Sequence, residues 1–392
     1  MTYSSRITNL QESATIAIST LATTLKAQGR DILSFSAGEP DFDTPEPIKL
    51  AAKAALDQGF TKYTQVAGIP ELKQAIANKL ERENGLRYES KQILVSNGAK
   101  QSLFNVFQAL IDKGDEVIIP APYWVTYPEL VTYSGGSNVF IETNEQNGFK
   151  ITAKSLRQAI TSKTKALVLT TPSNPTGMVY TKQELESIAQ VLQGSSIVVI
   201  ADEMYEKLLY DGEFVSVGSI SQDMFERTIT INGLSKSVAM TGWRMGYCAC
   251  ADSTLIKLMT NLQSQCTSNI NSITQKASII ALEGGVDTQI ESMRQAFLAR
   301  RDLAVAGINQ IKGLRTLSPQ GAFYLFISIG NACGGDSMEF CKQLLEQEGV
   351  ALVPGSAFGM DSFVRLSFAC SSEQLSQGIE RIARFMEGVK GV

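Results

Sequence analysis

The chain has 392 residues, of which 44% are hydrophobic and 19% are charged, and its formal net charge is −4. This composition is typical of a globular protein with a large core, and the slight negative charge gives no electrostatic footprint for a nucleic-acid partner. The sequence contains no histidine, which excludes Ser-His-Asp triads, Cys-His dyads and imidazole-bound metal ions.

The start of the sequence has no basic region followed by an apolar core, and no run of 18 apolar residues occurs in it. We therefore expect no membrane segment and a cytoplasmic protein. The six cysteines include no C-x-x-C pair, so we expect no metal site. Cys248 and Cys250 alternate within an apolar run and are expected to be buried, reduced thiols.

Short apolar runs bounded by turn residues recur along the chain. They lie at residues 92–96, 116–120, 165–170, 196–202, 228–231 and 246–251. Unbroken apolar runs of this length are typical of strands that are covered on both faces, as in a parallel sheet.

Segments with helical periodicity lie between these runs. Residues 70–84 place their leucines and isoleucine on one face and begin with Pro70, which suits the first turn of a helix. Thr181 and Glu184 form a T-x-x-E capping box before another apolar stripe, and residues 97–111 continue the alternation. Strands that alternate with helices predict an α/β fold with a mostly parallel sheet.

The pattern changes near residue 288. A long helix is predicted at 287–311, followed by candidate strands at 321–329, 351–355 and 363–370. The N-terminal segment has no core of its own, so we expect it to pack against this C-terminal part. The sequence thus predicts two domains. The large α/β domain spans 46–288, and the smaller α+β domain combines 1–45 with 289–392 and closes over the site between them.

Polar residues follow the apolar runs at the points where the predicted strands end. In open α/β sheets, ligands bind beyond the carboxyl ends of the strands. The residues at these points are 96–100, 123–124, 174–177, Asp202 with Tyr205, and 233–236. Together they supply a helix start suited to bind an anion, aromatic rings suited to stack on a ligand, a carboxylate and a lysine.

Each of these features also has a purely structural explanation. Residues 96–100 suit helix capping, Trp124 suits core packing, and an isolated Lys236 suits a solvated surface. The phosphate-binding motifs G-x-G-x-x-G and G-x-x-x-x-G-K-[ST] are both missing from the sequence. The combination of features is therefore what favours a ligand site.

The combination fits pyridoxal phosphate. A lysine amine attacks an aldehyde to form a Schiff base when its surroundings lower its pKa from about 10.4. Pyridoxal phosphate is an aldehyde that also needs an anion site, an acid opposite its ring nitrogen and a stacking partner.

Residues 233–246, GLSKSVAMTGWRMG, resemble the lysine-attachment signature of class I pyridoxal-phosphate aminotransferases. Further fragments resemble the bacterial branch of this family that contains aspartate and prephenate aminotransferases. They lie, in order, at residues 34–45, 61–76, 122–129, 170–177, 202–212 and 364–369. The resemblance implies a homodimeric fold type I enzyme that moves the amino group of L-aspartate to 2-oxoglutarate by a ping-pong route.

The resemblance also implies a role for each matched residue. Lys236 attaches the cofactor and moves the substrate proton, Asp202 pairs with the ring nitrogen, and Tyr205 with Asn174 binds the phenolic oxygen. The remaining cofactor contacts are implied for Trp124, Gly98, Ala99, Lys100, Ser235, Arg244 and Tyr63 of the partner subunit. The substrate α-carboxylate is implied to bind Arg365, Asn174 and Gly38, next to Trp124.

Charge counting extends this assignment to the distal carboxylate of aspartate. Arg365 is committed to the α-carboxylate and Arg244 to the phosphate, so Lys100 is the remaining cation within the matched motifs. Ser13, in the N-terminal segment, is expected to add a hydrogen bond beside it. The alternative is that Lys100 is a solvated lysine at a helix start.

Two positions depart from the family pattern. Gly233 replaces a serine that contacts the phosphate in some relatives, and Gln11 takes the place of a lysine found in prephenate-using relatives. Transamination of prephenate or aromatic amino acids on the same scaffold remains the alternative reaction. A non-catalytic amino-acid sensor is the alternative from another class, and the presence of both Lys236 and Asp202 argues against it.

Overall fold

The computed structural model describes residues 1–11 and 14–389. Within these residues the main sheet has seven strands in the order β2-β8-β7-β6-β5-β3-β4. Their bounds are β2 Ile93–Asn97, β8 Met245–Cys250, β7 Thr228–Gly233, β6 Val198–Asp202, β5 Thr164–Thr170, β3 Glu116–Ala121 and β4 Ser137–Glu142.

The expected parallel arrangement is confirmed for most of this sheet. Strands β3 to β7 pair in parallel, whereas β8 is antiparallel to both of its neighbours, β2 and β7. An apolar run specifies burial but not direction, which is why the sequence did not reveal the reversal of β8. The edge strand β4 was not predicted, because most of its side chains are exposed or half-buried and it has no unbroken apolar run.

Helices pack around the main sheet and follow the local signals of the sequence. Pro70 is the first residue of the predicted helix at 70–84, and Thr181 and Glu184 form the expected capping box. The helices are α3 Glu46–Asp57, α4 Pro70–Asn84, α5 Ala99–Leu110, α6 Thr126–Ser134, α7 Ala153–Ala159, α8 Lys182–Leu192, α9 Gln222–Arg227, α10 Ser253–Cys266 and α11 Ser272–Leu282.

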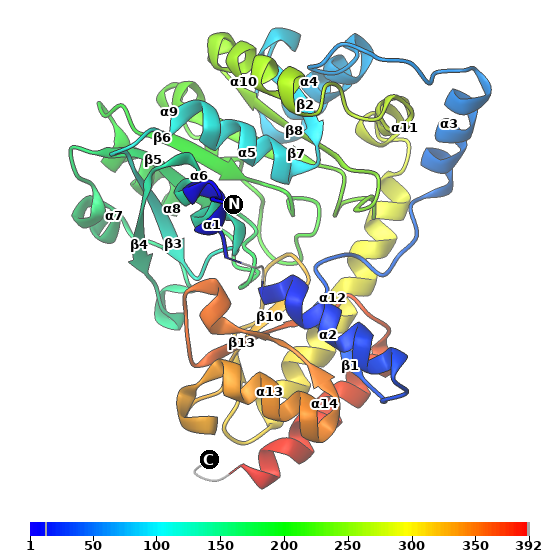
Figure 1. Ribbon diagram of the computed structural model, residues 1–392, viewed down its shortest axis with the longest axis vertical. Helices are drawn as coiled ribbons and strands as arrows, with labels where there is room; N and C mark the ends of the chain where they lie inside the picture. Colours follow the sequence, from blue (N-terminus) through cyan, green and yellow to red (C-terminus); the bar gives the residue numbers. More distant parts are fainter. Residues whose placement is uncertain (12–13, 390–392) are drawn as a thin grey trace.

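A second, smaller group of strands and helices lies below the main sheet in Figure 1. The long helix α12 (Asp287–Gln310) runs from the main sheet to this group. A four-stranded sheet in the described residues has the order β12-β13-β10-β9. Its strands are β12 Val353–Pro354, β13 Phe363–Ser367, β10 Tyr324–Ser328 and β9 Arg315–Thr316, and its helices are α13 Ser337–Glu348 and α14 Ser372–Gly388.

The N-terminal segment reaches both parts. Strand β1 (Leu33–Ser34) pairs in parallel with β11 (Val350–Ala351), and α2 (Ala14–Ala27) packs against β11 and β12, so these two elements contact the C-terminal part. The first helix, α1 (Ser5–Thr8), instead contacts α6 beside the main sheet (Figure 1). In the described residues, no helix combines the length and the apolar character that crossing a membrane requires.

Candidate active site

A cavity of about 510 Å³ opens where the strands of the main sheet end. Its size is within the range of small-molecule sites. It is lined by eleven of the predicted site residues: Gly38, Ala99, Lys100, Trp124, Asn174, Asp202, Tyr205, Ser235, Lys236, Arg244 and Arg365. Residues from the N-terminal segment, the main sheet and β13 therefore meet in one place.

Three predicted site residues do not line this cavity. Gly98 packs closely against the guanidinium of Arg244, since a Cβ at this glycine would lie 2.5 Å from a guanidinium nitrogen. Tyr63 is 90% exposed, so its own chain leaves its side chain uncovered. Ser13 lies outside the described residues.

Lys236 follows β7 in a turn whose flanking residues are buried. Its ammonium donates a hydrogen bond to the carbonyl of Gly38 and lies 5.9 Å from the centre of the Phe323 ring. Burial lowers the pKa of Lys236 to about 8, against the opposing effect of Glu39. A larger fraction of this amine is therefore unprotonated at neutral pH than for a solvated lysine, as a nucleophile requires.

Asp202 is the last residue of β6, and its carboxylate is buried. Oδ2 accepts a hydrogen bond of 2.7 Å from the hydroxyl of Tyr127, and Oδ1 accepts one of 3.2 Å from the backbone N–H of Met204. Burial raises the pKa of Asp202, while Tyr127, the Met204 N–H and Lys236 oppose this effect. A cation placed beside the carboxylate would compensate for its lost hydration.

Arg365 lies on β13 and is 1% exposed. Its guanidinium donates to the side-chain oxygen of Asn174 at 3.0 Å and to the carbonyl of Ser36 at 2.8 Å. Its Nε has no hydrogen-bond partner, and no carboxylate of the described residues forms an ion pair with it. A buried guanidinium of this kind is suited to bind a carboxylate that enters the cavity.

The start of α5 lies at the position where the sequence predicts an anion site. Gly98 precedes the helix with φ of 80°, a conformation that favours glycine. The guanidinium of Arg244 is held above this helix start, where it donates to the carbonyls of Thr241 at 2.9 Å and Asn97 at 3.2 Å. A helix N-terminus and a guanidinium together favour an anion such as a phosphate.

Several residues that line the cavity were missed in the sequence analysis. Tyr127 stands three positions after Trp124 in a fragment that was recognised, and Thr170 closes β5 opposite Asp202 in the parallel ladder. Thr170 carried a signal because it ends a strand, and Tyr127 and Ser36 lie inside the recognised fragments 122–129 and 34–45. Tyr324 carried none, because only the packing of the second sheet brings it to the cavity.

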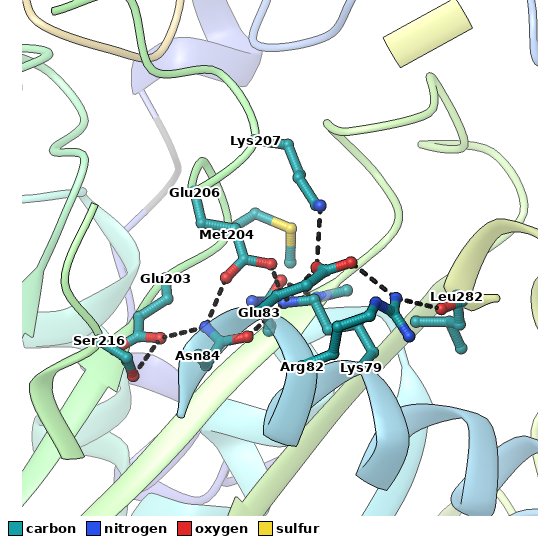
Figure 2. A network of polar contacts seen from close by, with 12 residues as sticks. Lys79, Arg82, Glu83, Asn84, Glu203, Met204, Glu206, Lys207, Ser216 and Leu282 are labelled. Carbon is teal, nitrogen blue, oxygen red and sulfur yellow. Dashed lines mark hydrogen bonds and ion pairs between the residues drawn. The ribbon is translucent and has the colours of Figure 1, made fainter. Parts of the chain in front are cut away.

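A polar network joins the end of α4 to residues 203–207, which follow β6 (Figure 2). The buried ammonium of Lys79, on α4, pairs with Glu206 and donates to Asn84 at 2.7 Å. Asn84 in turn donates to Glu206 at 2.7 Å and to Glu203 at 3.4 Å. Burial and the charge of Glu206 raise the pKa of Glu203 to about 8. The network therefore contains two buried carboxylates, of which Glu206 is paired with Lys79 and Glu203 has a raised pKa.

Replacing Lys79 with methionine should lower the free energy of unfolding by about 3–5 kcal/mol, because removal of one partner leaves the buried charge of Glu206 uncompensated. Urea titration of the variant against the unmodified protein measures this loss. The matched control is Lys207→Met, since Lys207 pairs with Glu83 at 2.8 Å but is 31% exposed and should contribute about 0–1 kcal/mol.

The double variant Lys79→Met/Glu206→Leu removes both charges and should recover much of the stability that Lys79→Met loses. A double variant that is less stable than Lys79→Met would show that the unpaired charge of Glu206 does not account for the loss.

Comparisons with known proteins agree with this geometry. The family of class I and II aminotransferases matches residues 30–382. The chain is 47% identical to an aspartate aminotransferase of Geobacillus stearothermophilus, over 99% of each chain. It is also 47% identical to a probable aspartate/prephenate aminotransferase of Rhizobium leguminosarum bv. phaseoli, over 98% of each chain.

Solved structures agree as well. The aspartate aminotransferase from Thermus thermophilus with maleate superposes with a TM-score of 0.94 at 44% identity, over 98% of this chain and 100% of that one. The aspartate aminotransferase from Rhizobium meliloti gives a TM-score of 0.95 at 43% identity, over 100% of both chains. The family match covers most of the chain, and the relatives are similar over nearly their whole length. The chain therefore belongs to the class I and II aminotransferases.

Proposed function

We propose that this chain is an aspartate aminotransferase, which moves the amino group of L-aspartate to 2-oxoglutarate by a ping-pong route and forms oxaloacetate and L-glutamate. One observation carries the proposal: a single cavity combines the amine of Lys236, the buried carboxylate of Asp202 and the buried guanidinium of Arg365. Similar proteins are named aspartate aminotransferases, and one of them was solved with maleate, which is a dicarboxylate.

Class I and II aminotransferases use pyridoxal 5′-phosphate, and the residues of the cavity fit this cofactor. The buried carboxylate of Asp202 suits a protonated ring nitrogen, because a cation beside it offsets its desolvation. The glycine at position 98 leaves room for Arg244 above the start of α5, where a phosphate is favoured. When bound, the cofactor supplies a protonated ring that accepts the electron pair released at the substrate Cα.

The other residues of the cavity have matching roles in this proposal. Tyr205 and Asn174 bind the phenolic oxygen of the cofactor, and Trp124 packs against its ring. The phosphate is held by the backbone at Gly98, Ala99 and Lys100, by Ser235 and Arg244, and by Tyr63 of the partner subunit.

Lys236 has two tasks in this reaction. Its amine would hold the aldehyde of the cofactor when no substrate is bound, and the free amine would take the proton from the Cα of a bound substrate. The lowered pKa of about 8 suits both tasks, because each of them begins with the unprotonated amine. Arg365 orients the substrate by its α-carboxylate, with Asn174 and the backbone of Gly38 beside it.

Replacing Lys100 with alanine tests the choice of substrate. Lys100 lines the cavity, with its ammonium 5.1 Å from the centre of the Trp124 ring, and partial burial together with Arg244 lowers its pKa. We expect kcat/KM for aspartate to fall by about 10- to 100-fold, which corresponds to a charge-assisted hydrogen bond of about 1.5–3 kcal/mol. Steady-state assays with 2-oxoglutarate and a panel of amino donors measure this change.

Alanine and phenylalanine are the informative comparison donors, because neither has a distal carboxylate, and their kcat/KM should change little. The control variant is Lys182→Ala, an exposed lysine at the start of α8, which should leave every donor unaffected. Equal losses for charged and uncharged donors would mean that Lys100 serves the cofactor or the fold. Amination of prephenate in the same panel tests the alternative reaction, which is named for some relatives.

We also propose a homodimer whose two sites each use Tyr63 of the partner subunit. The 90% exposure of Tyr63 in its own chain supports this arrangement. Mixing Lys236→Ala chains with Tyr63→Ala chains should restore activity to about a quarter of the unmodified value. Half of the dimers are then hybrids, and each hybrid has one site with intact Lys236 and Tyr63.

This experiment requires that Tyr63→Ala alone is severely impaired. Subunit exchange is verified by native mass spectrometry before the assay. Activity that stays at the level of the separate variants after complete exchange would indicate sites that are built within one chain.

We also propose a domain division and a cellular location for the chain. We propose that residues 1–45, apart from α1, which contacts α6, form with 289–392 a domain that closes over the cavity. The proposal is supported by the origin of the lining residues, since Gly38 and Arg365 come from these ranges whereas Lys236 and Asp202 come from 46–288. A cytoplasmic location is supported by the six cysteines, all of which are free thiols.

A further inference from the structure

Tyr324, on β10, lines the cavity but has no role in the proposed reaction. Its hydroxyl lies 2.8 Å from the hydroxyl of Tyr205, and both side chains are buried. Tyr205 is the one hydrogen-bond partner of this hydroxyl among residues 1–11 and 14–389. The pair joins the loop after β6 to the second sheet, so it crosses from one part of the molecule to the other.

The ring of Tyr324 is held in place from several sides. The guanidinium carbon of Arg365 lies 4.5 Å from its centroid, and Phe323 packs against it with ring centroids 4.7 Å apart. A Cβ added at Gly38 would lie 3.1 Å from the hydroxyl of Tyr324. The hydroxyl therefore has little freedom to leave Tyr205 for another partner.

The direction of this hydrogen bond follows from counting protons. Burial raises the pKa of Tyr324 and holds the pKa of Tyr205 well above its usual range, so both phenols keep their protons at neutral pH. A phenol has only one proton to donate. If Tyr205 donates its proton to the phenolic oxygen of the cofactor, the bond between the two tyrosines must be donated by Tyr324.

We propose that Tyr324 is a positioning residue that donates its hydroxyl proton to Tyr205 and thereby directs the proton of Tyr205 toward the phenolic oxygen of the cofactor. The inference rests on the proposed function, because it requires pyridoxal 5′-phosphate in the cavity. Successive hydrogen bonds polarise one another, so the first bond strengthens the second. Tyr324 thus sets how strongly Tyr205 stabilises the anionic form of the phenolic oxygen.

The test is a pH titration of the cofactor-loaded enzyme, followed by the near-ultraviolet and visible absorbance of the bound cofactor. A donor to the phenolic oxygen stabilises the deprotonated form, so a weaker donor raises the pKa of the cofactor. Tyr324→Phe keeps the ring under Arg365 and removes only the hydroxyl. We expect it to raise the cofactor pKa by about 0.1–0.6 unit, because a neighbouring donor strengthens a hydrogen bond by about 10–30% and loss of the whole Tyr205 bond is worth about 1–2 units.

Tyr205→Phe removes the whole bond to the cofactor and should raise its pKa by about 1–2 units. The double variant Tyr205→Phe/Tyr324→Phe should titrate like Tyr205→Phe alone, because Tyr324 acts only through Tyr205. Tyr210→Phe is the matched control. This phenol is half-buried, donates to the carbonyl of Ala322 and does not line the cavity, so the cofactor pKa should stay unchanged.

An unchanged pKa in Tyr324→Phe overturns the inference, and so does a double variant whose shifts add. Both results leave the proposed function intact, provided that the unmodified protein shows a bound cofactor that titrates. An unmodified protein that binds no pyridoxal 5′-phosphate overturns the proposed function together with the inference.

Discussion

Replacement of Lys236 by alanine should lower transamination by at least about four decades. Under the proposed function, the variant loses both the amine that binds the cofactor and the group that moves the substrate proton, and general acid–base catalysis alone contributes about 10²- to 10⁴-fold. The neighbouring residues of the cavity remain, so the variant should still bind pyridoxal 5′-phosphate without a covalent bond. Single-turnover assays with aspartate, together with equilibrium dialysis of the cofactor, separate these two properties.

The site of attachment has an independent test in the unmodified protein. Reduction of the loaded enzyme with borohydride, followed by peptide mapping, should place the pyridoxyl group on residue 236. The informative competitor is Lys100, since Lys100 and Lys236 are the two lysines that line the cavity in the described part of the chain. A label on Lys100 would falsify the assignment of Lys236 as the attachment residue.

Replacement of Asp202 by alanine should lower kcat by about two to four decades at saturating cofactor. Asp202 is buried, and its desolvated carboxylate is suited to keep the ring nitrogen of the cofactor protonated. Loss of one partner of a buried pair costs about 3–5 kcal/mol, and about 1.4 kcal/mol corresponds to tenfold in rate. Stopped-flow measurement of the half-reaction with aspartate reports the step in which the substrate proton is removed.

Asp202→Asn separates charge from packing. Asparagine keeps the size of the side chain and an oxygen for the hydroxyl of Tyr127 or the N–H of Met204, but it has no negative charge. We expect this variant to be impaired by a similar factor to Asp202→Ala. A loss of less than about fivefold in Asp202→Asn would show that the charge of this residue is not what supports the reaction.

Much of the fold follows from local features of the sequence. The capping box of Thr181 and Glu184 and the first-turn proline at position 70 predicted where two helices begin, because helix starts depend on a few neighbouring residues. The apolar runs predicted strands of the main sheet, since side chains covered on both faces must be apolar. The exposed edge strand β4 lacked this signal.

The positions of many residues that line the cavity also follow from local features of the sequence. Asp202 ends one apolar run and Asn174 lies four positions after the end of another, and the ends of parallel strands meet at one edge of a sheet. The motif around Lys236 was recognised as one fragment of sequence. Eleven predicted residues consequently line one cavity.

Only the tertiary structure decided which distant residues meet. The same packing sets the pKa values of the reacting groups. Lys236 donates to Gly38, which is 198 positions away, and Arg365 binds Asn174, which is 191 positions away. No local pattern encodes these pairs, nor the contact between Tyr205 and Tyr324. The pKa of Lys236 falls to about 8 mainly because the folded chain removes water from around its amine. Sequence by itself determined which chemical groups the protein has and on which elements they lie. Their burial, and therefore their reactivity, depends on packing between segments that are far apart in the chain.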